Sequence, residues 1–90
     1  MNEKNFREYL SQMLGLAQKY QKTLMWSEDI HINIDVMTCD KAMSMTIWCH
    51  TYKDDILQET VYFTISENDS WDAVGVKMQE FVKFVAPYLP

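Results

Sequence analysis

The chain has 90 residues, is 48% apolar and carries a net charge of −5, with 13 acidic against 8 basic side chains. This length and composition predict one globular domain with a single modest core, and they argue against a disordered chain. The acidic balance argues against direct binding of nucleic acid, because cationic side chains must replace the counterions along the phosphates.

Membrane, secretion and catalytic signals are missing from the sequence. No apolar run approaches the roughly 20 residues that span a bilayer, and the polar N-terminus lacks the apolar stretch of a signal peptide. We therefore expect a cytoplasmic protein with no membrane partner. No GxSxG, HExxH, P-loop or GxGxxG motif occurs in the chain, so we expect neither an enzyme nor a cofactor.

The two cysteines, Cys39 and Cys49, are expected to be reduced. Cys39 borders a predicted turn, and Cys49 falls on the core side of a predicted strand, so a disulfide between them is not expected. Two cysteines are also too few for a closed structural zinc site.

The first predicted element is an amphipathic helix over residues 3–23. Its apolar positions recur in steps of three and four, which is the spacing of one helix face; they are Phe6, Leu10, Met13, Ala17, Tyr20 and Leu24. Residues 25–29 connect this helix to the next element, and Trp26 within them is expected to close one end of the core.

Three strands are predicted next, over residues 30–38, 43–52 and 57–65, with turns at 39–42 and 53–56. Apolar and polar side chains alternate in them, which places successive side chains on opposite faces of a sheet. The apolar face holds Ile30, Ile32, Ile34 and Val36, then Met43, Met45, Ile47 and Cys49, then Val61, Phe63 and Ile65. This face is expected to form the core.

A second helix is predicted over residues 71–86 from its apolar stripe, which includes Trp71, Val74, Met78, Phe81 and Val85. Pro87 disfavours helical backbone at the residue before it and so limits the end of this helix. The fold class is therefore α+β in the order α-β-β-β-α, as a single compact domain over residues 1–90. Short turns predict a three-stranded antiparallel meander with the second strand in the centre. Each helix has one apolar stripe and the sheet has one apolar face, so both helices should pack on that face.

The alternation of inward and outward residues along each strand restricts the register of the sheet, since a slip by one residue would turn every side chain to the wrong face. A turn centred on residues 40–41 pairs Ile34 with Ile47, Val36 with Met45 and Ile32 with Cys49. It also sets His31 opposite His50 and Asn33 opposite Trp48. The third strand should bring Tyr62 beside His50 or Trp48, and the preferred outer row is His31–His50–Tyr62.

The uncovered face is the predicted binding surface. It would carry Trp48, Tyr52 and Tyr62 as anchors, with His31, His50 and Asn33 as polar contacts. Clustered exposed aromatic side chains are typical of protein interfaces. The partner is predicted to be another protein or a second copy of this chain, and protonation of the paired histidines would make the contact sensitive to pH. Strand addition at an open sheet edge is a second route to the same function.

Two alternatives remain open from the sequence. The acidic residues Glu28, Asp29, Asp54, Asp55 and Glu59 should gather at one end of the sheet. They could form an acidic patch that mimics nucleic acid and blocks a basic nucleic-acid-binding protein, as some phage inhibitors do. The other alternative is a small-ligand or metal-binding module at the His31/His50 pair. A flat sheet offers little concavity for a ligand, and no third metal ligand is apparent, so no metal is predicted.

The element order is similar to that of double-stranded-RNA-binding domains. In those domains, basic residues at the start of the second helix bind the RNA. The corresponding segment here, residues 70–77, reads Ser-Trp-Asp-Ala-Val-Gly-Val-Lys. The resemblance therefore extends to the topology and does not imply RNA binding.

Overall fold

The computed structural model describes residues 3–39 and 42–90. Within them, the predicted α+β class and element order are confirmed: a helix, a three-stranded antiparallel sheet in the order β1-β2-β3, and a second helix. The elements are α1 (Glu3–Thr23), β1 (Ile30–Cys39), β2 (Ala42–Lys53), β3 (Ile56–Ser66), α2 (Trp71–Val85) and the 3-10 turn η1 (Ala86–Tyr88). The predicted turn at 39–42 includes residues 40 and 41, which lie outside the described residues.

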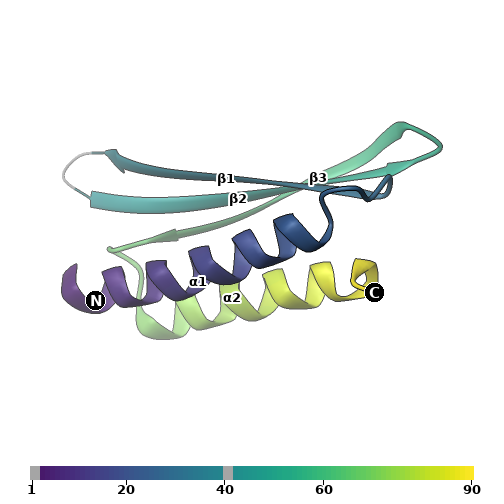
Figure 1. Ribbon diagram of the computed structural model, residues 1–90. Helices are drawn as coiled ribbons and strands as arrows, with labels where there is room; N and C mark the ends of the chain where they lie inside the picture. Colours follow the sequence, from purple (N-terminus) through teal and green to yellow (C-terminus); the bar gives the residue numbers. More distant parts are fainter. Residues whose placement is uncertain (1–2, 40–41) are drawn as a thin grey trace.

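The sheet forms one layer, and the two helices lie side by side on one of its faces (Figure 1). The core fills the space between the layers. Its fully buried side chains include Phe6, Met13 and Ala17 from α1, Met45, Ile47 and Cys49 from β2, Ile65 from β3, and Val74, Phe81 and Val85 from α2. Each large apolar side chain buried in this way stabilises the fold by about 1.5–3 kcal/mol. Within residues 3–39 and 42–90, no helix lies on the opposite face of the sheet (Figure 1).

The start of α2 is fixed by its own sequence. The Ser70 side chain accepts a hydrogen bond from the Ala73 backbone N–H at 3.2 Å, which satisfies one of the free amides of the first turn. Asp69 accepts one from the Ser66 backbone N–H at 2.9 Å and so closes the preceding turn. The α-helix ends at Val85, and Pro87 lies in the 3-10 turn that follows it.

The expectation that Trp26 closes one end of the core is wrong, because its side chain is 89% exposed. The end of the core is closed instead by Leu24, which is 6% exposed. Backbone hydrogen bonds from Leu24 N–H to Tyr20 and from Ser27 N–H to Leu24 continue the turn of α1. This tight exit leaves Trp26 outside the packed layers.

The hairpin between β2 and β3 turns on Asp54 and Asp55, with φ values of 54° and 63°. Two consecutive left-handed residues define a type I′ turn, whose twist matches that of the flanking strands. The pairing then shifts between Thr51 and Tyr52, so that Tyr52 pairs with Leu57 and Thr51 with Glu59. β3 therefore has one extra residue between Leu57 and Glu59, and this residue moves the rest of β3 along β2 relative to a regular ladder.

The observed pairing overturns the predicted outer row His31–His50–Tyr62. His50 pairs with Thr60, and Tyr62 pairs with Trp48, which is the other position that parity allowed. Val36, predicted on the core side, is 44% exposed, whereas Ile30 and Ile32 on the same side of β1 are buried, so burial on this side is lost towards the end of the strand. No helix among the described residues is long and apolar enough to cross a membrane.

Candidate functional site

The face of the sheet opposite the helices, called the outer face below, is built from residues that alternate with the buried positions of β2. Fourteen of its described residues are His31, Asn33, Asp35 and Met37 from β1, Ser44, Thr46, Trp48, His50 and Tyr52 from β2, and Leu57, Thr60, Tyr62, Thr64 and Ser66 from β3. They include all six side chains that the sequence predicts as the binding surface. Figure 1 shows that none of the described helices or strands covers this face.

The outer face is ordered in rows across the three strands. The register of β1 against β2 is as predicted, with His31 opposite His50 and Asn33 opposite Trp48. Three rows result: His31–His50–Thr60, Asn33–Trp48–Tyr62 and Asp35–Thr46–Thr64. Trp48 therefore lies at the centre of the face, with one histidine pair on one side and one carboxylate on the other.

Neighbouring side chains hold one another in place on this face. The Trp48 and Tyr62 rings meet edge to face, with 6.4 Å between centroids, and the His31 and Tyr52 rings lie 5.0 Å apart. His50 Nδ1 lies 2.9 Å from Thr60 Oγ1, within hydrogen-bonding distance. Trp48, His50 and Tyr52 are half-buried by these contacts, whereas Tyr62 is 62% exposed. Because these side chains are already ordered, less entropy is lost when a partner covers them.

Charge is nearly absent from the outer face. Asp35 is the only one of those fourteen described residues with a charged side chain, leaving the histidines aside, while 23% of the whole chain is charged. Depletion of charge together with enrichment of aromatic side chains marks the buried core of protein interfaces.

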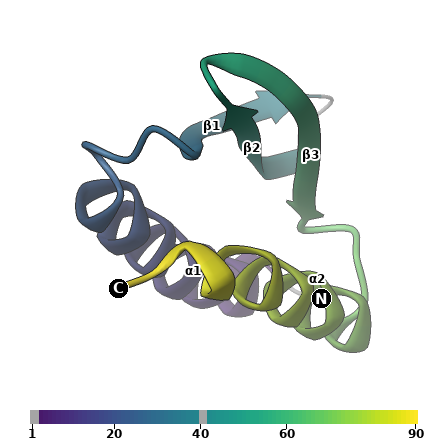
Figure 2. The same ribbon diagram turned by 90° about the vertical axis from the view of Figure 1, so that its right-hand side faces the viewer.

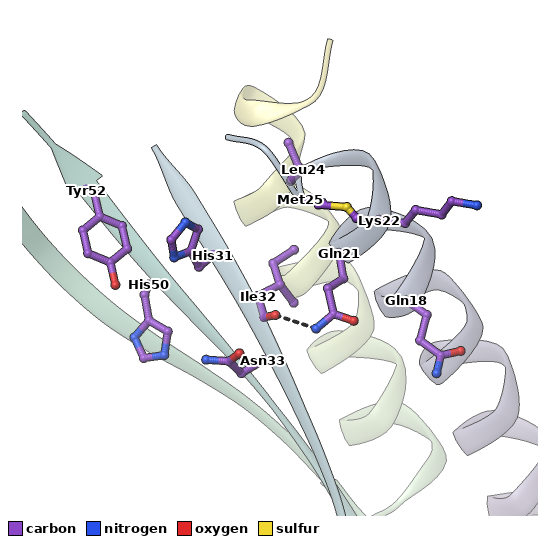
Figure 3. Close-up of a pocket in the computed structure, with 10 residues that line it drawn as sticks. All are labelled: Gln18, Gln21, Lys22, Leu24, Met25, His31, Ile32, Asn33, His50 and Tyr52. Atoms are coloured by element: carbon purple, nitrogen blue, oxygen red, sulfur yellow. Dashed lines mark hydrogen bonds between the residues drawn. The ribbon is translucent and has the colours of Figure 1, made fainter. Parts of the chain in front are cut away.

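A groove at the edge of this face corrects the expectation, drawn from the sequence, that the face offers little concavity. It encloses about 630 Å³. Its wall on the sheet side is formed by His31, Asn33, His50 and Tyr52, and its wall on the helix side by Gln18, Gln21, Lys22, Leu24 and Met25 (Figure 3). Ile32 lies between the two walls, and its carbonyl accepts a hydrogen bond from Gln21 Nε2 at 2.8 Å. Periodicity could not reveal this groove, because it depends on where α1 lies relative to β1.

The five acidic residues predicted at one end of the sheet are all exposed there. Asp29 directly precedes β1, and its carbonyl accepts a hydrogen bond from the Tyr52 backbone N–H at 2.8 Å. Asp54 and Asp55 form the adjoining turn, and Glu59 pairs with Thr51. The exposed Trp26 precedes Glu28 and Asp29 in the α1–β1 connection.

The alternative metal or ligand site considered from the sequence would lie at the His31/His50 pair. His31 and His50 are paired across β1 and β2. No group of three or more histidine, cysteine or acidic side chains that could hold a metal ion occurs among the described residues.

Cys49 is a free, fully buried thiol, and burial raises its pKa to about 11. The raised pKa favours the folded state below pH ~9, and this contribution is lost as the pH rises through ~11. We expect the free energy of unfolding of the native chain, relative to Cys49→Ala, to fall by roughly 2 kcal/mol over this range. Urea titrations of both proteins at each pH measure this difference, and a constant difference would contradict it. The side chain of Cys39 lies outside the described residues.

Comparison with known proteins adds no assignment. No protein-family model, no curated protein and no solved structure shows significant similarity to this chain.

Proposed function

We propose that this protein is a small, non-enzymatic interaction module that pairs with a second copy of itself through the outer face. The observation that carries the proposal is the composition of that face. Trp48, Tyr52 and Tyr62 gather on a surface with a single carboxylate, in a chain with 21 charged side chains. Tryptophan and tyrosine at the centre of a contact are the side chains that most often dominate binding energy.

A second copy fits because the outer face complements itself. The Asn33–Trp48–Tyr62 row is the middle row of the face. Asp35 lies in the row on one side of it, and His31 lies in the row on the opposite side. A two-fold axis along this middle row sets Asp35 of each copy over His31 of the other, while Trp48 stays at the centre. Such a two-fold arrangement is the commonest form of self-association.

The size of the outer face sets the expected strength. Three strands about 4.8 Å apart, each contributing a few rows, make a surface of roughly 15 Å by 25 Å. This is smaller than the roughly 800 Å² per partner of a standard stable interface. A weak dimer with a dissociation constant of about 10–100 µM is therefore expected.

Sedimentation velocity from about 5 µM to about 500 µM tests the proposal. We expect the mass to rise from that of the monomer to that of the dimer. Added salt should leave the association intact or strengthen it, because it screens the repulsion between two copies of charge −5. A monomer mass over the whole range would contradict the proposal.

A second candidate function, inhibition of a basic nucleic-acid-binding protein, draws support from the acidic end. Glu28, Asp29, Asp54, Asp55 and Glu59 are exposed together with Trp26. This function requires an association that weakens steeply with salt and is lost when Asp54 and Asp55 are changed to lysine. The outer-face dimer predicts neither effect, so the same two measurements separate the two functions.

The third candidate, a small-ligand or metal site at His31 and His50, draws support from the groove, whose wall includes both imidazoles. A rise in melting temperature with zinc or nickel that is absent in His50→Ala would favour it.

A further inference from the structure

We propose that the groove beside β1 is a vacant position for a fourth strand, and that it binds an extended peptide segment carrying a carboxylate. This inference goes beyond the proposed self-association, although the groove shares its sheet-side wall, His31, Asn33, His50 and Tyr52, with the outer face. The groove residues Gln18, Gln21 and Lys22 come from α1 and take no part in the outer face.

The backbone of β1 presents groups on its open side that no strand of the described sheet pairs with. β1 pairs with β2 only, so its other side is open. The bond from Gln21 to the Ile32 carbonyl shows that this carbonyl points away from β2. In an antiparallel strand every second residue directs its N–H and C=O to the same side, so Ile34 and the exposed Val36 also present theirs to the open side, whereas Ile30 is fully buried and does not. These are the groups that an added strand would pair with.

The helix α1 provides a floor for such a strand. Seen along the layers, the C-terminal end of α1 extends outward past the edge of β1 (Figure 2). Gln21, Lys22 and Met25 lie on this overhang and line the groove, with Ile32 between them and the sheet wall (Figure 3). An extended segment in the groove would therefore lie beside β1 and above α1. Its alternate side chains would meet the helix and the outer face.

Gln21 already makes a bond that an added strand would make. Its side-chain amide N–H donates to the Ile32 carbonyl at 2.8 Å, as the backbone N–H of a neighbouring strand does. The Gln21 side chain is exposed, so an incoming backbone can displace it into water at little cost. Gln21 thus holds the position in the free protein and competes with the peptide.

Charge and shape select the occupant. Lys22 is charged at neutral pH, and none of the acidic residues line the groove, although the chain has 13 of them. A carboxylate on the peptide side chain that faces α1 would meet the Lys22 ammonium. A second copy pairing through its own β1 would bring its own overhanging α1 into the same space, which favours a lone extended segment.

A library of random heptapeptides is the probe, selected on the full chain and followed by fluorescence polarisation with single synthetic peptides. We expect selected peptides to alternate β-branched residues with a carboxylate. N-methylation of the amides that face β1 should abolish binding, whereas N-methylation of the alternate amides should leave it intact. This positional pattern is specific to strand addition.

Two pairs of variants complete the test. Gln21→Ala removes the competing amide and should tighten binding about fivefold, whereas the matched control Gln12→Ala, an exposed glutamine of α1 that does not line the groove, should leave binding unchanged. Lys22→Glu should weaken carboxylate peptides about tenfold and spare neutral ones, whereas Trp48→Ala should have no effect. Failure to select any peptide, the absence of a positional N-methyl effect, or weaker binding by Gln21→Ala would each overturn the inference. None of these outcomes bears on the outer-face dimer.

Discussion

Phe81→Ala should cost about 3–5 kcal/mol of folding free energy, the largest effect expected for one substitution in this chain. Phe81 is fully buried, and its ring lies 5.7 Å from that of Tyr20 in α1 and 5.5 Å from that of Phe63 in β3. The side chain therefore joins α2 to the other helix and to the sheet at one point. A domain of this size has a stability near the lower end of about 5–15 kcal/mol, so the variant should be largely unfolded at about 37 °C.

Urea denaturation followed by circular dichroism measures this loss, and Phe84→Ala is the matched control. Phe84 lies about one turn after Phe81 in α2 and is half-buried, with its ring 5.9 Å from that of Phe63 and 6.3 Å from that of Tyr88. Its replacement should therefore cost about half as much as that of Phe81. Equal costs, or a larger cost for Phe84→Ala, would contradict the placement of Phe81 at the centre of the core.

Trp48→Ala should weaken self-association about 30-fold, which corresponds to the roughly 2 kcal/mol that a central aromatic anchor contributes. Trp48 lies in the middle row of the outer face, and its ring contacts that of Tyr62. The side chain is half-buried within the monomer, so the variant should remain folded with a modest loss of stability. Sedimentation at matched concentrations measures the dissociation constant, and a thermal melt confirms the fold.

Trp26→Ala is the matched control, because it removes the same side chain from a different exposed surface. Trp26 is 89% exposed and lies in the α1–β1 connection, away from the outer face. Its removal should leave both stability and self-association unchanged. The reverse result, with Trp26→Ala dissociating the dimer and Trp48→Ala sparing it, would move the contact to the acidic end.

The alternation of apolar and polar residues, together with a turn centred on residues 40–41, was enough to predict the register of β1 against β2. Both strands alternate apolar and polar residues without interruption, and a slip by one residue would have buried His50 or exposed Ile47. The pairs Ile34–Ile47 and His31–His50 accordingly lie where the sequence places them. The candidate face could therefore be predicted residue by residue on these two strands.

Parity could not resolve the register of β3, because steps of two residues preserve the facing of every side chain. The left-handed turn at Asp54 and Asp55, together with the irregular pairing near Tyr52, decides which even-numbered residue of β3 pairs with His50. The exposure of Trp26 and the groove at Gln21 depend on how α1 ends and where it lies against β1. These are tertiary features without a periodic signal in the sequence.

The most direct test of the central claim is a dilution series followed by the three tryptophan indole N–H signals in a nitrogen–proton correlation spectrum. The signals of Trp48, Trp26 and Trp71 report on the outer face, the α1–β1 connection and the start of α2. The account predicts that the Trp48 signal shifts with concentration while the other two stay fixed. A Trp48 signal that does not move up to about 500 µM, or a shift confined to Trp26 or Trp71, would contradict an interface on the outer face.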